Sequence, residues 1–357
     1  MKRSISPPSA KRVKLERLQV TRYAPSIPPR PIHRLSQGQL RIFSWNINGI
    51  DPFLQPAITT YFTKSSRKRQ RSPSTDDEAT VGSSFRTCLA RWQFPQIVGL
   101  QEVKIRPGDE KTMGRVRKAV ATSSKTDQSY RAFFSLPRDK YNAKGFGGKV
   151  YGVAMLVRED VIDAGATVSD IDWDLEGRIL VLKLPKHKIA VFNVYAVNGT
   201  DNPYRNPNTG EVEGTRHDRK RQFHSDLHQE IQKLEADKWS VIVAGDLNIA
   251  RSLIDGFPGI RMAAAHIQNR ADFESKFISN DGSGLCMLDT FRHLHDDERK
   301  YSYRSRGVTW GASCDRVDLI LASRTAGSAV SGADILDTIL ERGPSDHVPI
   351  YVTLELD

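Results

Sequence analysis

Polar side chains recur where apolar segments of the chain begin or end, and their types suit hard cations and proton transfer. The apolar runs "IFSW", "IVGLQ" and "VIVAG" lead directly into such residues, and two later apolar segments start with them. The set comprises Asn46, Asn48, Glu102, Asp246, Asn248, Asp318, Asp346 and His347. Strand ends along one rim of a sheet lie close together. These carboxylates, amides and one imidazole would therefore form a site for Mg²⁺ and a phosphate group.

Taken one at a time, these residues have ordinary structural explanations. Asn48 with Gly49 is a common turn pair, and Asp246 could cap a loop at the end of its strand. Turn chemistry explains less well why acids and amides recur at so many separate strand ends. The pattern therefore favours metal-assisted chemistry at a phosphate, with His347 supplying a base.

The segments that would position these residues alternate between apolar strands and amphipathic helices. Strands are predicted over residues 40–47, 96–103, 130–136, 151–157, 178–184, 188–197, 240–249, 315–323 and 348–356. Helices are predicted over residues 52–62, 109–122, 215–236 and 269–279. Several strands follow one another without intervening helices, which argues against a simple parallel sheet. We therefore expect an α/β protein in which two mixed sheets pack face to face, with helices outside.

The composition, 38% hydrophobic and 27% charged, is that of a globular domain. No apolar run approaches the ~20 residues of a membrane-spanning helix, so no membrane association is expected. The basic N-terminus also has no apolar segment typical of a secretory signal. Cys88, Cys286 and Cys314 are widely spaced and odd in number, which argues against a disulfide framework and favours a reducing compartment.

The net charge of +11 is concentrated in two segments. Residues 1–40 carry +8 and residues 63–87 carry +3, so the remainder is near neutral. We expect a disordered basic tail over 1–40, and a domain over 41–357 with a low-complexity insertion near 63–87. The cluster "PSAKRVKLE" (8–16) resembles a nuclear import signal, which predicts a nuclear protein bound by an import receptor. A solvated tail or a polyanion tether is the alternative.

Six motifs, in order, resemble those of the exonuclease III and apurinic-endonuclease branch of the endonuclease/exonuclease/phosphatase superfamily. They are "SWNINGI", "LQEVK", "VYAVNG", "AGDLNIA", "CDRVDLI" and "SDHVPI". The resemblance runs from about residue 40 to the C-terminus. It implies a DNase I-like, four-layer α/β sandwich and a Mg²⁺-dependent phosphodiesterase, with Mn²⁺ as a possible substitute.

The resemblance also implies roles for single residues. Asp246 and Asn248 would position or deprotonate the attacking water, and Tyr195 would reach a phosphate oxygen. His347 would contact the scissile phosphate, oriented by Asp318. The implied metal ligands are Glu102, Asn46, Asn48 and Asp346. The resemblance implies substrate contacts for Asn198 and Arg178, and it places Tyr303 in the pocket and Arg304 near the DNA backbone. Arg219 and Arg221 lie in a segment longer than the usual loop of that family and could grip phosphates; a solvated start of a helix is the alternative.

The "VYAVN" segment bears on the substrate. Branches that act on 5′-tyrosyl DNA, RNA tails or lipids usually place a His in that strand, whereas Tyr195 followed by Asn198 resembles the apurinic and 3′-exonuclease branch. Three segments depart from that branch, and one of them is "YSYRSR" (301–306), which stands where the branch usually has Phe-Trp. Residues 50–52 read Ile-Asp-Pro in place of Leu-Arg-Ala, and Asp315 occupies the place of a Trp that helps wall the pocket for a base-less sugar.

We therefore expect a monomeric hydrolase of DNA repair that acts on duplex DNA with abasic or 3′-blocked sites. It would cut on the 5′ side of abasic sites, trim 3′ ends, or do both. One alternative is a phosphodiesterase of the same fold that acts on RNA or another phosphate ester. The other is an inactive DNA-binding protein on this scaffold, which the complete set of competent residue types argues against.

Overall fold

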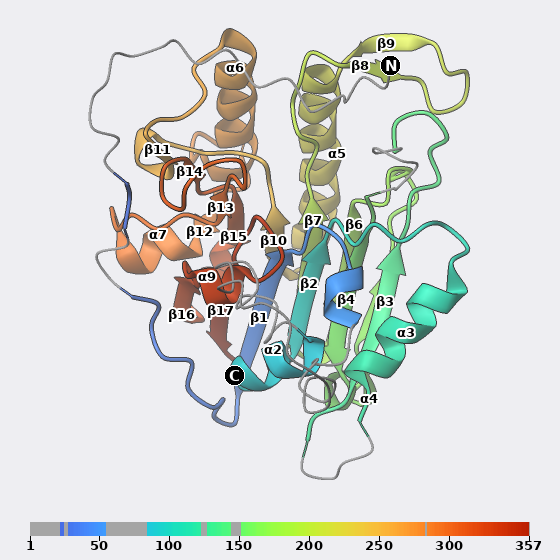
Figure 1. Cartoon of the computed structure of the whole chain (residues 1–357), viewed down its shortest axis with the longest axis vertical. Helices are drawn as coiled ribbons and strands as arrows, with labels where there is room; N and C mark the ends of the chain where they lie inside the picture. The colour runs from blue at the N-terminus through green and yellow to red at the C-terminus, as the bar shows by residue number, and fades with distance from the viewer. Residues whose placement is uncertain are drawn as a thin grey trace, which may run out of the picture.

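Two six-stranded mixed sheets form the centre of the computed structural model, which describes residues 22–24, 28–54, 84–122, 127–143, 151–282 and 284–356. The first sheet runs in the order β16 (Val330–Ile335), β17 (Ile350–Glu355), β1 (Gln39–Asn46), β2 (Ile97–Gln101), β4 (Val153–Arg158) and β3 (Tyr130–Ser135). The second runs β12 (Leu288–Asp289), β15 (Asp318–Ala322), β10 (Ser240–Asp246), β7 (Ile189–Tyr195), β6 (Ile179–Leu184) and β5 (Thr167–Ser169). Each sheet has one parallel pair near its centre, β1 with β2 and β7 with β10 (Figure 1).

Apolar side chains on alternate strand positions fill three layers. Ile42 and Val191 belong to the core between the two sheets. The outward-facing Phe43 joins a core under α2 (Phe85–Arg91) and α3 (Glu110–Val120), and Phe192 joins a core under α5 (Arg216–Ala236). Because a strand turns successive side chains to opposite faces, each sheet is buried on both sides. The predicted four-layer sandwich of two mixed sheets with outer helices is confirmed.

Helix α5 shows why the sequence forms a helix at this place. Thr215 and Asp218 form a reciprocal capping box at its N-terminus, which satisfies backbone N–H groups that the helix leaves unpaired. Phe223, Leu227 and Ile231 then recur every four residues and are buried against the second sheet. The same face also buries the charged Lys220, which is only 1% exposed.

Shorter elements complete the fold. A small sheet consists of β11 (Gly256–Phe257), β14 (Cys314–Asp315) and β13 (Tyr303–Arg304). A hairpin of β8 (Pro203–Arg205) and β9 (Val212–Thr215) precedes α5. The other helices are α4 (Glu159–Asp163), α6 (Ala264–Phe273), α7 (Thr290–His295), α8 (Arg324–Gly327), α9 (Ile339–Arg342) and a π-helical turn, η6 (Glu274–Ile278). The 3₁₀ turns are η1 (Asp51–Leu54), η4 (Pro185–His187) and η5 (Leu253–Asp255).

Several predicted boundaries need correction. The described part of 52–62 is a 3₁₀ turn that ends at Leu54. The predicted insertion over 63–87 extends too far, because Ser84 already caps α2. The helix predicted over 269–279 begins earlier, at Ala264. The import-like cluster at 8–16, and the insertion up to residue 83, lie outside the described residues.

Part of the predicted tail, 1–40, contacts the folded body. Arg30 forms ion pairs with Glu298 and Asp334. Tyr23 packs against Tyr301. The composition of this segment did not reveal these contacts, because they join it to residues about 270–300 positions away.

Within the described parts of the chain, no helix is long and apolar enough to cross a membrane.

Candidate active site

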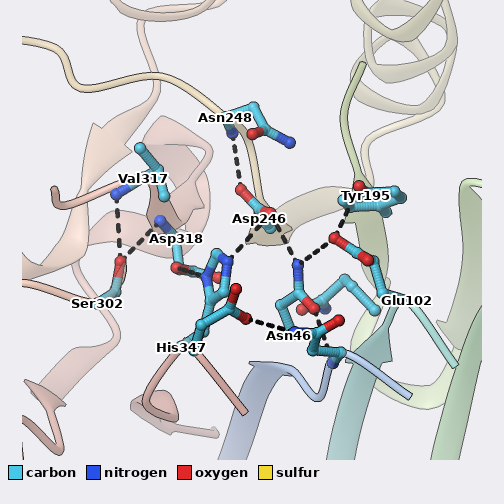
Figure 2. A network of polar contacts seen from close by, with 12 residues as sticks. Asn46, Glu102, Tyr195, Asp246, Asn248, Ser302, Val317, Asp318 and His347 are labelled. Atoms are coloured by element: carbon cyan, nitrogen blue, oxygen red, sulfur yellow. Dashed lines mark hydrogen bonds and ion pairs between the residues drawn. The ribbon is translucent and has the colours of Figure 1, made fainter. Parts of the chain in front are cut away.

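The predicted residues converge because the two parallel strand pairs end at the same place. The last residues of β1 and β2 are neighbours in the first sheet, Asn46 beside Gln101. The last residues of β7 and β10 are neighbours in the second, Tyr195 beside Asp246. The sheets are stacked, and a hydrogen bond of 3.0 Å from Asn46 Nδ2 to Asp246 Oδ2 joins the two rims. Figure 2 shows Asp246 between the His347–Asp318 pair and the Glu102–Asn46 pair.

The backbone leaves three of the four rim strands, β1, β2 and β10, in an uncommon conformation. Asn48, Glu102, Lys104 and Asn248 all have positive φ angles, between 51° and 54°. Residues other than glycine adopt this region rarely, and such strain tends to cluster at functional sites. At these positions the left-handed turn directs the polar residues that follow each strand toward one cleft.

His347 is oriented by an acid. Its Nδ1 lies 2.7 Å from Asp318 Oδ2, and its Nε2 lies 3.9 Å from Asp246 Oδ2. Burial alone would lower the pKa of His347, but the carboxylates of Asp318 and Asp246 outweigh burial and raise that pKa to about 10. The side chain is therefore an imidazolium at neutral pH, available to contact an anion.

Two serines that the sequence analysis did not single out hold this pair in place. Ser345 Oγ accepts a hydrogen bond of 3.0 Å from His347 N and donates one of 2.6 Å to Asn46 O. Ser302 Oγ accepts from the backbone N–H of Asp318 at 3.0 Å. Ser345 lies inside the "SDHVPI" motif and could have been found there, whereas nothing in the sequence around Ser302 indicates its role.

Asp246 occupies the centre of the site and is buried. Burial and the nearby Asp318 raise its pKa to about 7, against the lowering effect of His347 and Asn46. Its Oδ1 accepts a hydrogen bond of 2.9 Å from the backbone N–H of Asn248. A carboxylate with a pKa near neutrality is suited to accept a proton from water.

Asp246, Asp318 and His347 lie close enough together to be considered as metal ligands. A histidine must be neutral to bind a metal, and the pKa of His347 is raised by its two acidic neighbours. These three residues therefore fit a proton-transfer chain better than a metal site.

Glu102 is the centre of a second group of oxygen ligands. Its Oε1 accepts hydrogen bonds from Asn46 Nδ2 at 3.1 Å and from Tyr195 Oη at 2.8 Å. Its Oε2 lies 3.0 Å from Lys104 Nζ. Burial would raise the pKa of Glu102, but Lys104, Asn46 and Tyr195 outweigh it and lower that pKa. The carboxylate is therefore ionised and pairs with the ammonium group of Lys104.

Asn48 and Asp346 complete this group. Asn48 Nδ2 donates to Asp346 Oδ1 at 3.0 Å, and Asn48 Oδ1 accepts from Lys104 Nζ. Lys104 thus marks a position where oxygen atoms of Glu102 and Asn48 converge on a positive charge. Carboxylate and amide oxygens are the ligands of Mg²⁺ and Mn²⁺, so the donor set fits the expected divalent metal. Lys104 is part of "LQEVK" but was not predicted as a site residue.

A cleft of about 830 Å³ joins these groups. Asn198 and Tyr303, both predicted to contact substrate, line it together with Glu102, Asp246 and His347. Another wall of the cleft is basic and was not predicted. Arg261, His266 and Arg270 line that wall, next to the buried Lys220.

Three arginines predicted to contact substrate do not line the cleft. Arg178 and Arg219 are buried and share the carboxylate of Glu176, at 2.9 Å and 3.3 Å. Arg304 is buried and paired with Asp337. The sequence predicts these arginines as substrate contacts, but each already neutralises a buried acid.

Arg178 instead helps to position Tyr195. Its guanidinium lies 4.9 Å from the centre of the Tyr195 ring and donates to Tyr195 O at 3.1 Å. Arg221, the remaining predicted contact, is partly exposed and bonds to Asp218 at 2.6 Å.

Comparison with known proteins agrees with this geometry. A model of the Endonuclease/Exonuclease/phosphatase family matches residues 43–347, so the chain belongs to that family. The chain is 24% identical over 336 residues to the DNA-(apurinic or apyrimidinic site) endonuclease of Dictyostelium discoideum. This alignment covers 91% of this chain and 73% of that protein. The chain is also 25% identical over 272 residues to exodeoxyribonuclease III of Haemophilus influenzae. That alignment covers 72% of this chain and 89% of the relative.

The fold also matches solved structures. The AP endonuclease LMAP from Leishmania major aligns with a TM-score of 0.61 at 18% identity, over 92% of this chain and 93% of that one. These relatives confirm the resemblance to the exonuclease III and apurinic-endonuclease branch, and they place the chain among the nuclease-type hydrolases of the family.

Proposed function

We propose that the protein is a Mg²⁺-dependent phosphodiesterase of DNA repair, which cuts 5′ to abasic sites, trims 3′ ends, or does both. The observation that carries the proposal is the pairing of two groups in one cleft. Asp246 and His347, with the orienting Asp318, could transfer a proton and contact a phosphate. Glu102, Asn48 and Asp346 present hard oxygen ligands beside them. The two named relatives act in the same chemical class.

In this mechanism the scissile phosphate lies between the two groups. Asp246 accepts a proton from the attacking water, whose position the side chain of Asn248 would help to fix. His347, charged through Asp318, donates a hydrogen bond to a phosphate oxygen as negative charge builds there. Tyr195 and Asn198 would contact the other oxygens. A metal held by Glu102, Asn48, Asp346 and the neighbouring Asn46 would supply charge neutralisation at the leaving 3′-oxygen.

The basic wall would hold the nucleic acid backbone. Among the residues that the structure describes, Arg261 and Arg270 have no acidic partner. Their positive charge is therefore available to phosphates of the bound strand. Phosphate contacts of this kind give affinity without sequence preference.

The deciding experiment uses purified protein with Mg²⁺ on matched duplexes. The duplexes carry an abasic site, a recessed 3′ end, a 3′-phosphate, or no lesion, and an RNA strand of the same sequence is the comparison. Cleavage beside the abasic site or at the 3′ ends supports the proposal. Preference for RNA would favour the alternative substrate, and binding without cleavage of any strand would favour an inactive DNA-binding protein.

We also propose that the protein acts as a monomer in the nucleus, carried there by an import receptor. The support for import is the basic cluster at residues 8–16. A fluorescent fusion of the full chain that stays in the cytoplasm would contradict it.

A further inference from the structure

A short N-terminal segment packs against the back of the cleft wall. The backbone N–H of Tyr23 donates to Gly311 O at 3.0 Å. The ring of Tyr23 meets that of Tyr301 edge to face, with 4.6 Å between centroids. The guanidinium of the buried Arg304 lies 5.5 Å from the Tyr23 ring and 4.2 Å from the ring of Trp310. Aromatic and cation–π contacts of this kind orient side chains as well as stabilise them.

The fit between this segment and the loop that joins β13 to β14 is close. Gly311 has a φ of +83°, and a Cβ atom on it would lie 2.2 Å from Tyr23 O. No other residue type can take this conformation against this neighbour without displacement. Gly311 is therefore the residue that allows Tyr23 to reach the loop.

The opposite face of the same hairpin forms part of the cleft. Tyr303 and Asp315 are paired across β13 and β14, and both line the cleft. The ring of Tyr303 lies 5.0 Å from that of His347. Successive residues of a strand face opposite sides, so Arg304 faces Tyr23 while Tyr303 faces the cleft. A shift on one side of this hairpin moves the other.

The two ends of the hairpin are not held equally. The β13 end is fixed to the segment that carries Asp346 and His347, since Arg304 N donates to Asp346 O at 2.8 Å. The side chain of Arg304 also pairs with Asp337. The connecting loop is held by Tyr23, by Arg306 Nε, which donates to Ser345 O at 3.3 Å, and by Trp310, whose ring lies 5.1 Å from the Arg342 guanidinium. Loss of Tyr23 would therefore disturb the loop and Asp315 more than His347.

We propose that Tyr23 is a positioning residue that sets the wall of the substrate cleft, so that the segment before the catalytic domain takes part in substrate recognition. The inference rests on the proposed nuclease function. Tyr23 touches no reacting group, so its loss should weaken substrate binding and leave the chemical step almost unchanged.

The chain offers a matched pair of variants. Within the described residues the Tyr23 hydroxyl has no hydrogen-bond partner. Tyr23→Phe keeps the ring contacts and removes only that hydroxyl, so it should behave as wild type. Tyr23→Ala removes the ring, and Tyr23→Leu keeps apolar bulk without the cation–π contact. We expect KM for an abasic duplex to rise about ten-fold in Tyr23→Ala and less in Tyr23→Leu, with kcat within about two-fold of wild type.

Hydrogen exchange provides a readout that does not depend on activity. Amides of residues 305–315 should exchange faster in Tyr23→Ala than in Tyr23→Phe, while amides of β1 and β10 stay protected. Equal exchange in the two variants, or an unchanged KM in Tyr23→Ala, would overturn the inference. If the wild-type protein cleaves none of the duplexes, the proposed function fails, and the exchange measurement still decides whether Tyr23 positions the wall.

Discussion

The floor and the wall of the cleft are built differently. The floor lies at the ends of β1, β2, β7 and β10, where Asn46, Glu102 and Asp246 are fixed by direct mutual hydrogen bonds. The wall comes from the small sheet β11–β14–β13 and from α6, and it places exposed or half-buried residues such as Arg261 and Tyr303 around the opening. The floor is therefore preorganised by the two large sheets, whereas the wall depends on short strands and on contacts with distant segments.

This difference assigns the chemical step to the floor and substrate recognition to the wall. A group that must act at a reacting atom needs a position fixed to a fraction of an ångström, which packed central strands provide. Groups that hold a flexible polyanion tolerate looser placement. Floor variants should therefore change the rate of the chemical step, and wall variants should change binding and its dependence on salt.

The largest effect is expected from the centre of the floor. His347→Ala and Asp246→Asn should each reduce the single-turnover rate by about 10³-fold or more, because each removes a group that acts in the transition state. Asp318→Ala should also reduce the rate strongly, since the imidazole loses the acid that orients and charges it. Unfolding temperature and duplex affinity serve as controls and should stay close to wild type. A His347→Ala protein with a near wild-type rate would contradict the assignment.

A smaller effect is expected from the metal group. Glu102→Gln should raise the Mg²⁺ concentration needed for half-maximal activity by about ten-fold or more, because an amide is a poorer ligand than a carboxylate for a hard cation. Thermal unfolding gives an independent measurement. Mg²⁺ should raise the unfolding temperature of the wild-type protein and should do so less in Glu102→Gln. Equal metal dependence in the two proteins would remove Glu102 from the ligand set.

The sequence predicted the floor well for a physical reason. Each floor residue lies at one end of an apolar strand, within a short motif that can be recognised in the sequence. The parallel pairing of β1 with β2 and of β7 with β10 brings those motifs to one rim. Asp246, His347 and Glu102 could therefore be placed together before any coordinates were known.

Apart from Tyr303, the wall and its supports could not be predicted in the same way. Arg304 and Arg178 look like phosphate contacts in the sequence, yet burial beside Asp337 and Glu176 assigns their charges to ion pairs. Arg261 has no motif around it, and its place in the cleft depends on where the loop before α6 runs. Tyr23 belongs to a segment whose composition predicts disorder, and its partners are close only in three dimensions.

The basic wall offers a sharper test of the comparison. Arg261→Gln and Arg270→Gln should each weaken binding to a duplex, and each lost phosphate contact should reduce the slope of log affinity against log salt by about 0.9. The saturated single-turnover rate should change little, because among the described contacts neither arginine forms a hydrogen bond or ion pair with Asn46, Glu102 or Asp246. Arg131→Gln is a matched control, since Arg131 is an exposed arginine on β3 that pairs with Asp163. Loss of the chemical rate without loss of affinity would place these arginines in the floor.

The smallest effect on the rate of the chemical step is expected from deletion of the basic tail. The structure indicates which residues such a deletion should include. A deletion of 1–40 would remove Tyr23 and Arg30, which pack on the folded body, and would mix two effects. A deletion of 1–21 removes the basic cluster and leaves both contacts in place. This shorter deletion should leave the saturated single-turnover rate unchanged.

The remaining readouts of that deletion separate two roles of the tail. If the tail binds DNA, duplex affinity should fall and its salt dependence should become shallower. If the tail is an import signal, the salt slope should stay the same and a fluorescent fusion should spread into the cytoplasm. We expect import as the main role, with a modest contribution to binding, because the cluster "PSAKRVKLE" (8–16) resembles an import signal. A truncated fusion that still enters the nucleus would contradict this, unless removing the second basic segment at 65–71 as well abolishes entry.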